Sequence, residues 1–507
     1  MIRWLQVILS FLIPFGLLSY AVWRVPVADG YVDPVGRIAA QDEALYSHIS
    51  LRMAATGEWL APKFLDRLAL FKPPLLYWLS AACVRLFDAN PFVLRLPSML
   101  AGAATAALLL GILRSWAGIA ALLLLLGDPL WHTLSRLALT DALLAAFTAG
   151  AVHAITRSSL LQFATCTAAA LMTKGIAGLI PMIALTIWWL VSSPVHRWPL
   201  SRLILWLTAP LPPFLLWAAS QLWLHPRWFW AEFVQVEILG YSFGTPPQTS
   251  EESKLGFYLG RLLRLDPLLL VVLGTCFLRA RYLLGDPAHR AWLSLVLAVA
   301  LALSGNQYRN IAYVLPAVPA LAYFGGLLAA KHARPAAILL ALVYAFRATQ
   351  PDQPWGLRFQ PVHNIKVRQS LETYAQLGRT HDLLIVDPED EFVATTLGLR
   401  KVRYVYFGDL EPYRRYGLDF HALGIAVTLE EWRDRKARIP RYLKLLRQWG
   451  VDSAEPIASV IVLRDASELP VLIETTPEAD FLLRRRWPSP HHEVRELPEG
   501  RVFLYAP

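Results

Sequence analysis

A series of long apolar runs dominates the first two thirds of this chain. They lie near residues 5–23, 92–112, 115–131, 139–156, 159–173, 176–192, 203–224, 266–278, 291–304, 311–330 and 335–347. A helix needs about 20 apolar residues to cross the ~30 Å hydrocarbon core of a bilayer, so the shorter runs leave their boundaries open by a few residues. Because 56% of the residues are hydrophobic and only 17% are charged, we predict a polytopic α-helical membrane protein with about eleven spans.

Charge and cysteine usage exclude several other classes. The formal net charge is +10, which in a membrane protein indicates topology and anionic lipid before nucleic acid. The sequence has no zinc-knuckle spacing, basic tail or helix-turn-helix signal. Cys83, Cys166 and Cys276 each lie inside an apolar run and are interpreted as core residues, not as a disulfide or metal framework. The first run lacks a small-residue cleavage site, so it is interpreted as a retained span.

Short basic connections set the predicted topology. "RWPLSR" after residue 196, "RARYLLGDPAHR" at 279–290 and "KHAR" at 331–334 should lie in the cytoplasm by the positive-inside rule. This choice places Met1 inside and the first loop, 24–91, outside. "PPLLYWLSAACVRLF", 73–87, would invert every later loop if it crossed the membrane. We therefore expect it to lie on the outer surface as an interfacial segment.

This topology brings several separated segments to one outer face. They are the first loop, "RLALTD" before the run at 139, "TKG" at 173–175, "GNQYRN" at 305–310 and the long loop 225–265. From about residue 348 charge density rises, and strand-like stretches such as "HDLLIVD", "VRYVYFG" and "SVIVLR" alternate with helical ones. The sequence thus predicts a membrane domain, 1–347, and a soluble α/β domain, 348–507, outside the cytoplasm.

The first loop holds a pair of adjacent carboxylates, Asp42 and Glu43. Leu45, Ile49 and Met53 follow at four-residue spacing, which predicts a helix with one apolar stripe lying on the membrane. Asp42 would then stand at the helix N-terminus, where it could simply cap the free backbone N–H groups. The alternative is a chemical role shared with its neighbours.

Six further charged residues fall on the same predicted face: Lys72, Arg136, Asp141, Lys174, Glu237 and Arg309. Each has an ordinary alternative: the lysines could be interfacial, Asp141 could cap its helix with Thr140 as a rival, and Arg136 could neutralise Asp141. Together they gather carboxylates and cations around one cavity. A lipid-linked phosphate substrate needs this arrangement, with cations for the phosphate and a carboxylate for a nearby hydroxyl.

Seven motifs in order resemble a known family over roughly residues 1–330. They are "DEALY", "ATGEWLAP", "FKPPLLYWL", "RLPSML", "ALTDALL", "LMTKGIAGLIP" and "YVLPAVPALA". In this order they resemble bacterial GT-C class membrane glycosyltransferases, in particular the aminoarabinose transferases that modify lipid A and the protein O-mannosyltransferases. The resemblance implies an inner-membrane enzyme. It would move a sugar with inversion from a polyprenyl-phosphate donor to a lipid, glycan or protein acceptor on the outer face.

The resemblance also implies roles for single residues. Asp42 is expected to be the general base, and Asp141 matches a second acidic position. Lys72, Lys174, Arg309 and Arg136 are expected to hold the donor phosphate. The residues expected to contact the substrates are Glu43, Tyr46, His48, Glu237 and Tyr313. A divalent metal is compatible with these carboxylates, but no spacing in the sequence requires one.

The chain also departs from the family pattern. Leu45 stands where an arginine is usual, Phe71 where a glutamate precedes the lysine, Ile238 where a histidine follows the glutamate, and His48 where an acid is frequent. These departures favour a neutral hexose over a charged aminosugar as the donor. Two alternatives to a transferase also stay open. One is a transporter or flippase of a lipid-linked substrate, and the other is a non-catalytic relative that binds a partner through its soluble tail.

Overall fold

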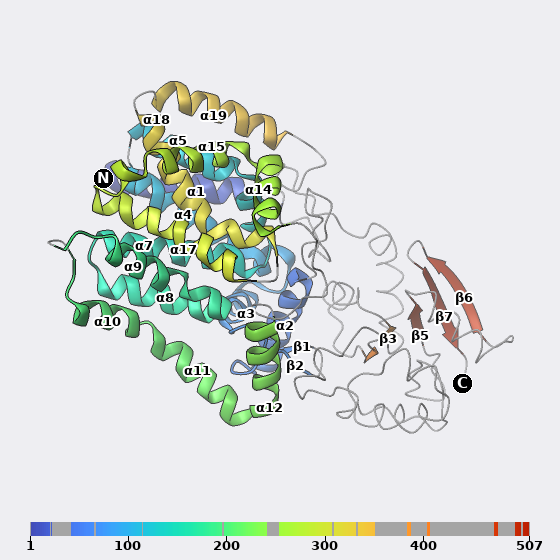
Figure 1. The fold of residues 1–507 in the computed structure, drawn as a ribbon. Coiled ribbons are helices and arrows are strands. Elements are labelled where there is room, and N and C mark those ends of the chain that lie inside the picture. Colours follow the sequence, from blue (N-terminus) through green and yellow to red (C-terminus); the bar gives the residue numbers. More distant parts are fainter. Residues whose placement is uncertain are drawn as a thin grey trace.

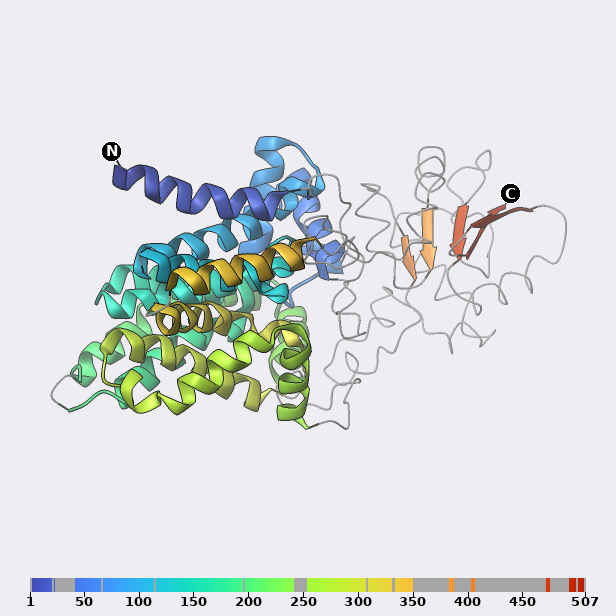
Figure 2. The same ribbon diagram turned by 90° about the horizontal axis from the view of Figure 1, so that it is seen from above.

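The computed structural model describes most of the helical part of the chain and five strands near its C-terminus (Figure 1). The described residues are 2–20, 22, 42–64, 67–113, 115–194, 197–240, 253–306, 309–330, 333–349, 383–386, 403–405, 471–474, 492–497 and 500–505. Figures 1 and 2 show the helices packed side by side, and in Figure 2 α1 (Ile2–Ser19) lies along one flank. Helix α1 packs against α4 (Pro91–Leu113).

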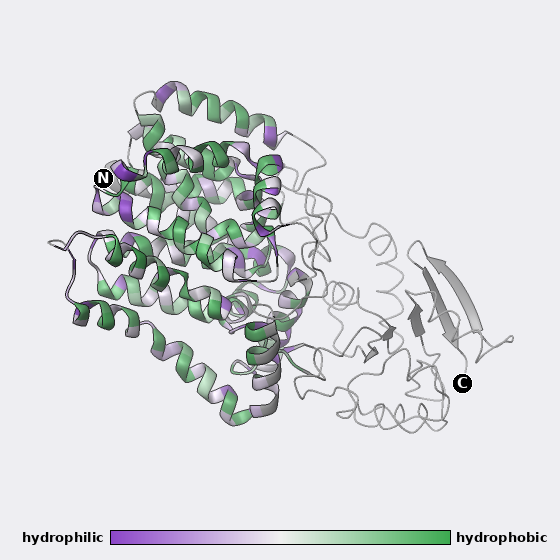
Figure 3. Cartoon of the chain, viewed as in Figure 1, coloured by the Kyte–Doolittle hydropathy of each residue, from purple (hydrophilic) through white to green (hydrophobic). Residues whose placement is uncertain are grey.

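Every apolar run predicted from the sequence coincides with helical structure. Besides α1 and α4, the helices are α5 (Ser115–Gly127), α6 (Pro129–Leu134), α7 (Thr140–Thr156), α8 (Leu160–Lys174), η2 (Gly175–Leu179), α9 (Ile180–Leu190), α10 (Leu200–Thr208), α11 (Leu211–Leu224), α15 (Pro267–Leu278), α16 (Ala280–Leu283), α17 (Pro287–Gly305), η4 (Ile311–Ala317), α18 (Val318–Ala329) and α19 (Ala333–Ala348). Apolar residues cover most of these helices in Figure 3. The chain is a multi-pass membrane protein.

Helix length and composition do not confirm the predicted number of about eleven spans. Four helical segments within the described residues are long and apolar enough to cross a membrane, or five if a bent pair counts as one span. That bent pair is α10 and α11, which meet at 43° where we predicted a single run over 203–224. Pro210 lies at the break and Pro212 and Pro213 follow. Prolines lack the N–H that would continue an α-helix, so the chain changes direction here.

The first loop folds onto the bundle through α2 (Asp42–Thr56), a short antiparallel pair β1 (Lys63–Phe64) and β2 (Arg67–Leu68), and α3 (Leu75–Phe87). The helix predicted from residue 42 is confirmed. Its apolar stripe differs from the prediction, because Ile49 and Met53 are buried in the main hydrophobic core and do not face outward. Burial against protein removes as much apolar surface from water as a membrane would, and the sequence pattern is the same for both.

Helix α3 has 13 residues, so it extends roughly 20 Å and is too short to cross the hydrocarbon core. Leu79, Leu86 and Phe87 are exposed along it, while Leu76 and Tyr77 are buried against the bundle. One side therefore packs on protein and the other presents apolar residues outward. This pattern is compatible with an interfacial helix, and the placement of 73–87 on the outer surface stays a prediction.

The segment predicted as a long loop, 225–265, is largely helical. It contains α12 (Pro226–Trp228), a π-helix η3 (Phe229–Gly240) and α14 (Lys254–Leu265). The start of η3 packs into a small aromatic cluster: Phe233 lies 5.1 Å from Phe229 and 5.5 Å from Trp217 of α11, measured between ring centroids. A π-helix is rare and occurs frequently at functional sites.

The described residues of the C-terminal region form one five-stranded mixed sheet with the order β4-β3-β5-β7-β6. The strands are β3 (Leu383–Val386), β4 (Arg403–Val405), β5 (Val471–Glu474), β6 (His492–Leu497) and β7 (Gly500–Tyr505). β4, β3 and β5 are parallel, whereas β7 pairs antiparallel with β5 and β6. Two predicted strands coincide with β3 and β4. "SVIVLR" and the predicted helices lie outside the described residues, so the α/β domain and its boundary at 348 stay predictions.

Candidate active site

Lys174 and Asp141 form a nearly buried ion pair at one end of the bundle. Lys174 is the last residue of α8, and Asp141 lies in the first turn of α7. The Lys174 Nζ atom is 2.6 Å from Asp141 Oδ1, and each side chain is 11% exposed. The N-cap of α7 is Leu139, which makes no side-chain capping hydrogen bond. The alternative in which Asp141 or Thr140 caps the helix is therefore wrong. The Asp141 carboxylate instead pairs with the Lys174 ammonium.

The late-span turn contacts this pair through an aromatic ring. The ammonium of Lys174 lies 5.0 Å from the ring centroid of Tyr313 in η4, close enough for a cation–π interaction. Asn310 caps η4 by accepting a hydrogen bond of 2.9 Å from the Ala312 amide. Arg309, next to that cap, is half-buried. Residues 309 and 310 lead into η4, whose Tyr313 lies beside Lys174 of the "TKG" turn. The shared face predicted for the whole turn at 305–310 stays a prediction.

Lys72 forms the second lysine–carboxylate pair of the site. Its ammonium bonds the carboxylate of Glu237 on η3, and both side chains are mostly buried, with 13% and 19% exposed. Pro73 and Pro74 follow Lys72 and are buried. Because proline fixes the backbone angle φ, these residues hold the lysine segment in one direction. The two residues are 165 positions apart in the chain, and the sequence offered no sign that they would pair.

A carboxylate that sequence reasoning missed supports the same segment. Glu232 of η3 is 2% exposed, and its Oε2 atom accepts a hydrogen bond of 2.7 Å from the backbone amide of Leu70. An acid inside the apolar stretch "FWAEFVQVEIL" is a signal that could have drawn attention to it, because an unpaired charge in such surroundings is costly.

Gly175 lies where the segment after Lys174 contacts the segment after Lys72. It has φ +54°, in the left-handed region that favours glycine, which confirms the tight turn predicted after Lys174. A Cβ atom at this position would lie 3.1 Å from the ring of Phe233 and 3.7 Å from Pro73. The turn after Lys174, the segment after Lys72 and the π-helix are therefore in contact with one another, which the sequence predicted only as a shared face.

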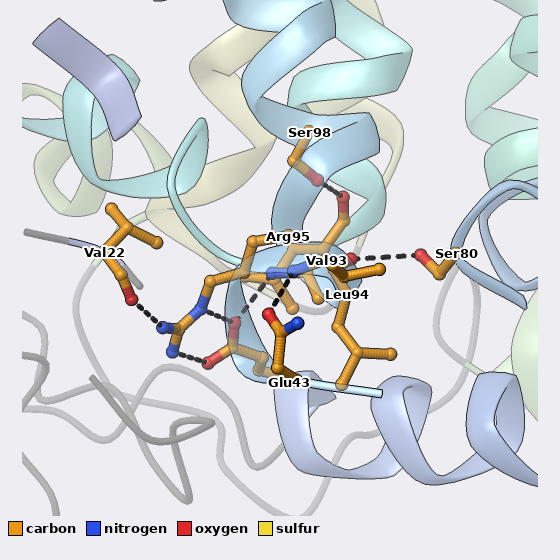
Figure 4. Close-up of polar contacts among 10 residues, drawn as sticks. Val22, Glu43, Ser80, Val93, Leu94, Arg95 and Ser98 are labelled. Carbon is orange, nitrogen blue, oxygen red and sulfur yellow. Dashed lines mark hydrogen bonds and ion pairs between the residues drawn. The ribbon is translucent and has the colours of Figure 1, made fainter. Parts of the chain in front are cut away.

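Glu43 is buried in a bidentate ion pair with Arg95 of α4 (Figure 4). Arg95 donates from Nε and Nη2 to the two carboxylate oxygens at 2.7 and 2.9 Å, and Oε1 also accepts from the Ala138 amide at 2.8 Å. Arg95 is 0% and Glu43 1% exposed. This pair fixes the N-terminal end of α2, where Asp42 stands. The side chain of Asp42 lies outside the described residues, and its role as base stays a prediction.

The remaining predicted site residues are mostly buried in the packing around α2. Tyr46 is buried, with its ring centroid 6.3 Å from Phe71 and 5.6 Å from Tyr77. His48 is also buried. Arg136 is fully buried, and its Nη2 donates to the Tyr20 carbonyl at 2.8 Å, whereas Lys174 neutralises Asp141. Substrate contact by these residues stays a prediction.

A metal centre was left open by the sequence. In the part of the chain that the structure describes, no group of three or more His, Cys, Asp or Glu side chains is placed to hold a metal ion. In the Lys72–Glu237 and Lys174–Asp141 pairs, each carboxylate binds a lysine ammonium.

Comparison with known proteins gives two kinds of match. Residues 71–223 match a family model described as dolichyl-phosphate-mannose-protein mannosyltransferase. The fold is similar to the crystal structure of ArnT from Cupriavidus metallidurans bound to undecaprenyl phosphate, with a TM-score of 0.66, 15% identity and 98% of each chain covered. The apo form of that protein gives a TM-score of 0.64 at 15% identity, covering 98% of this chain and 97% of that one.

Proposed function

We propose that this chain is a GT-C class membrane glycosyltransferase, because residues 71–223 match the mannosyltransferase family model and the fold is similar to that of ArnT. We propose that it is an inverting glycosyltransferase that uses a polyprenyl-phosphate sugar as donor. The acceptor would be a hydroxyl of a lipid, glycan or protein at the outer face of a bacterial inner membrane. The observation that carries this proposal is that two lysine–carboxylate pairs belong to segments in contact. Gly175, next to Lys174, lies against Pro73, next to Lys72, and against Phe233 of η3.

Phosphate chemistry explains why two lysines belong at this site. When the bond between the anomeric carbon and the phosphate oxygen breaks, the phosphodiester becomes a monoester and gains negative charge. Cations already in position stabilise that charge as it develops. In the described structure Lys72 and Lys174 are held by Glu237 and Asp141. A bound phosphate would compete with those carboxylates for the ammonium groups.

A base is needed on the acceptor side of the reaction. An acceptor hydroxyl has a pKa far above 7, so its nucleophilicity rises when a carboxylate takes its proton in the transition state. We assign this role to Asp42. The acceptor oxygen forms a bond to the anomeric carbon, its proton passes to the Asp42 carboxylate, and the polyprenyl phosphate leaves with the electron pair of the broken bond. Glu43, locked by Arg95, holds the start of α2 in place.

The residues around Lys72 indicate which chemical class of donor the site would bind. ArnT was crystallised with undecaprenyl phosphate, so a polyprenyl chain is the first donor carrier to test. Phe71 precedes Lys72 and contacts the aromatic ring of Tyr46. An aromatic wall suits the apolar face of a neutral sugar better than an ammonium group that needs a carboxylate partner. We therefore favour a neutral hexose.

The test compares cell-envelope lipids, glycans and surface proteins by mass spectrometry. A deletion strain of the native host is complemented with wild type, with Asp42→Asn, or with Glu58→Gln, an exposed acid on the outer loop that serves as control. Loss of one sugar mass in the deletion and Asp42→Asn strains, with Glu58→Gln normal, supports transfer and identifies sugar and acceptor together. If all variants express and no mass changes, the proposal fails, and flipping of lipid-linked sugar across sealed vesicles becomes the assay.

A further inference from the structure

We infer that Glu232 is a positioning residue: it anchors the backbone before Lys72 to the π-helix and so sets where the phosphate-binding ammonium stands. This inference rests on the proposed function, because it assumes that Lys72 binds the donor phosphate. Glu232 itself does not act on the reacting atoms in this view. Its contact is with the backbone two residues before the lysine.

The contact is short, buried and specific. Glu232 Oε2 accepts from the Leu70 amide at 2.7 Å, across 162 residues of sequence. Leu70 is fully buried, and Glu232 is 2% exposed. A hydrogen bond to a charged acceptor is stronger than one between neutral groups, and a buried amide left without an acceptor is costly. The backbone of Leu70 is therefore held at a fixed distance from η3, and Lys72 follows after one residue.

The π-helical winding explains how one element holds both the backbone and the lysine. Glu232 and Glu237 are five positions apart, the spacing of the i→i+5 bond that defines this helix type. In a π-helix they lie on the same side, about one turn apart, whereas in an α-helix with 3.6 residues per turn they would diverge by about 140°. Glu232 can therefore bind Leu70 while Glu237 binds Lys72. Regular α-helix over this stretch would turn one of the two acids away.

The same helix also supports the second lysine. Phe233, next to Glu232, packs against the turn at Gly175, where a Cβ atom would come within 3.1 Å of its ring. On its other side Phe233 stacks on Phe229 and meets Trp217 of α11. The aromatic cluster thus fixes the helix to the membrane part, and Glu232 connects that fixed body to the Lys72 segment.

The test is a double-mutant cycle on donor-phosphate binding. Full-length protein in lipid nanodiscs is titrated with undecaprenyl phosphate, and Kd is measured for wild type, Lys72→Ala, Glu232→Ala and the double variant. We expect Lys72→Ala to raise Kd about tenfold or more and Glu232→Ala about fivefold, but the second change to add less than about twofold when Lys72 is absent. Glu232→Gln keeps an oxygen acceptor and should restore Kd to within about twofold of wild type.

Each outcome bears on the inference. Coupling between the two substitutions supports it. If Lys72→Ala weakens binding but Glu232→Ala has no effect, or adds its full effect in both backgrounds, Glu232 does not act through Lys72 and the inference is wrong while the proposed function stands. If Lys72→Ala leaves Kd unchanged, the phosphate site and the inference both fail. Should Glu232→Ala not fold, Glu232→Asp takes its place in the cycle, because it keeps the charge but withdraws the acceptor from Leu70.

Discussion

Lys174 at the end of α8 and Asp141 at the start of α7 meet with 2.6 Å between ammonium nitrogen and carboxylate oxygen. The two helices run side by side in the bundle, and the pair joins their ends where the late-span ring of Tyr313 also lies. In the sequence each residue had an ordinary alternative, a cap or an interfacial lysine. The structure shows that the two residues form an ion pair. A carboxylate and an ammonium this close stabilise each other in mostly buried surroundings.

Replacing Lys174 should weaken the reaction more than it weakens the fold. Lys174→Gln removes a cation from the proposed phosphate site, and loss of a charged hydrogen bond of roughly 1.5 to 3 kcal/mol corresponds to a transfer rate lower by about 10- to 100-fold. The measurement is sugar transfer from a radiolabelled polyprenyl-phosphate donor by purified protein. Lys63→Gln is the matched control, since Lys63 pairs with Glu58 at 2.8 Å on the exposed surface. Equal rates in wild type and Lys174→Gln would remove Lys174 from the site.

Replacing Arg95 should lower the stability of the fold more than replacing Lys174. Arg95→Met leaves Glu43 buried without its bidentate partner, which costs roughly 3 to 5 kcal/mol of unfolding free energy. Arg95→Lys keeps the charge but cannot donate from two nitrogens in one plane, so it should rescue only part. The double variant Glu43→Gln, Arg95→Met should lose less than the sum of the single changes. Thermal unfolding in detergent is measured for Arg95→Met, Arg95→Lys, Glu43→Gln and the double variant. Strictly additive losses of stability would contradict an interaction between Glu43 and Arg95.

Gly178 should not accept a side chain. A Cβ atom there would lie 2.3 Å from the Leu171 backbone nitrogen, and a backbone atom cannot move aside as a side chain can. Gly178→Ala should therefore reduce the yield of folded protein severely. Gly111→Ala in α4 is the control, because no atom lies within 4 Å of its added Cβ, and alanine favours helix by up to about 1 kcal/mol. The comparison is made by size-exclusion chromatography, and similar profiles for both variants would contradict the close approach.

His48 should make stability fall at acidic pH. Burial lowers the pKa of His48 from 6.5 to about 4, and the charge of Arg52 lowers it as well. Protonation is then harder in the folded than in the unfolded chain, so the contribution of the neutral ring is complete above pH 6.5 and is lost as pH falls towards 4. Melting temperatures in detergent between pH 7.5 and pH 4 should decline more steeply for wild type than for His48→Gln. Superimposable pH curves would show that this ring does not titrate as its burial requires.

Much of the membrane part was predictable because a bilayer imposes simple rules. Each apolar run became helix, since backbone groups in hydrocarbon must bond within their own segment. The short run at 73–87 became the 13-residue helix α3, and its interfacial placement stays a prediction from that length. Charge alone marked Lys72, Asp141 and Lys174. The bend at Pro210 was also readable, but the prediction over 203–224 passed over its prolines.

The partners of those charges were decided by tertiary structure alone. Glu237 finds Lys72 across 165 residues, and Glu232 finds Leu70 across 162, distances over which sequence periodicity carries no information. The π-helix that carries both acids packs through Phe233 against Trp217 and Gly175, which are also far away in the sequence. The sequence determined which residues are apolar, charged or rigid, and hence the spans and the candidate site. Which charges meet was decided by three-dimensional packing, because an ion pair forms between side chains close in space, whatever their separation along the chain.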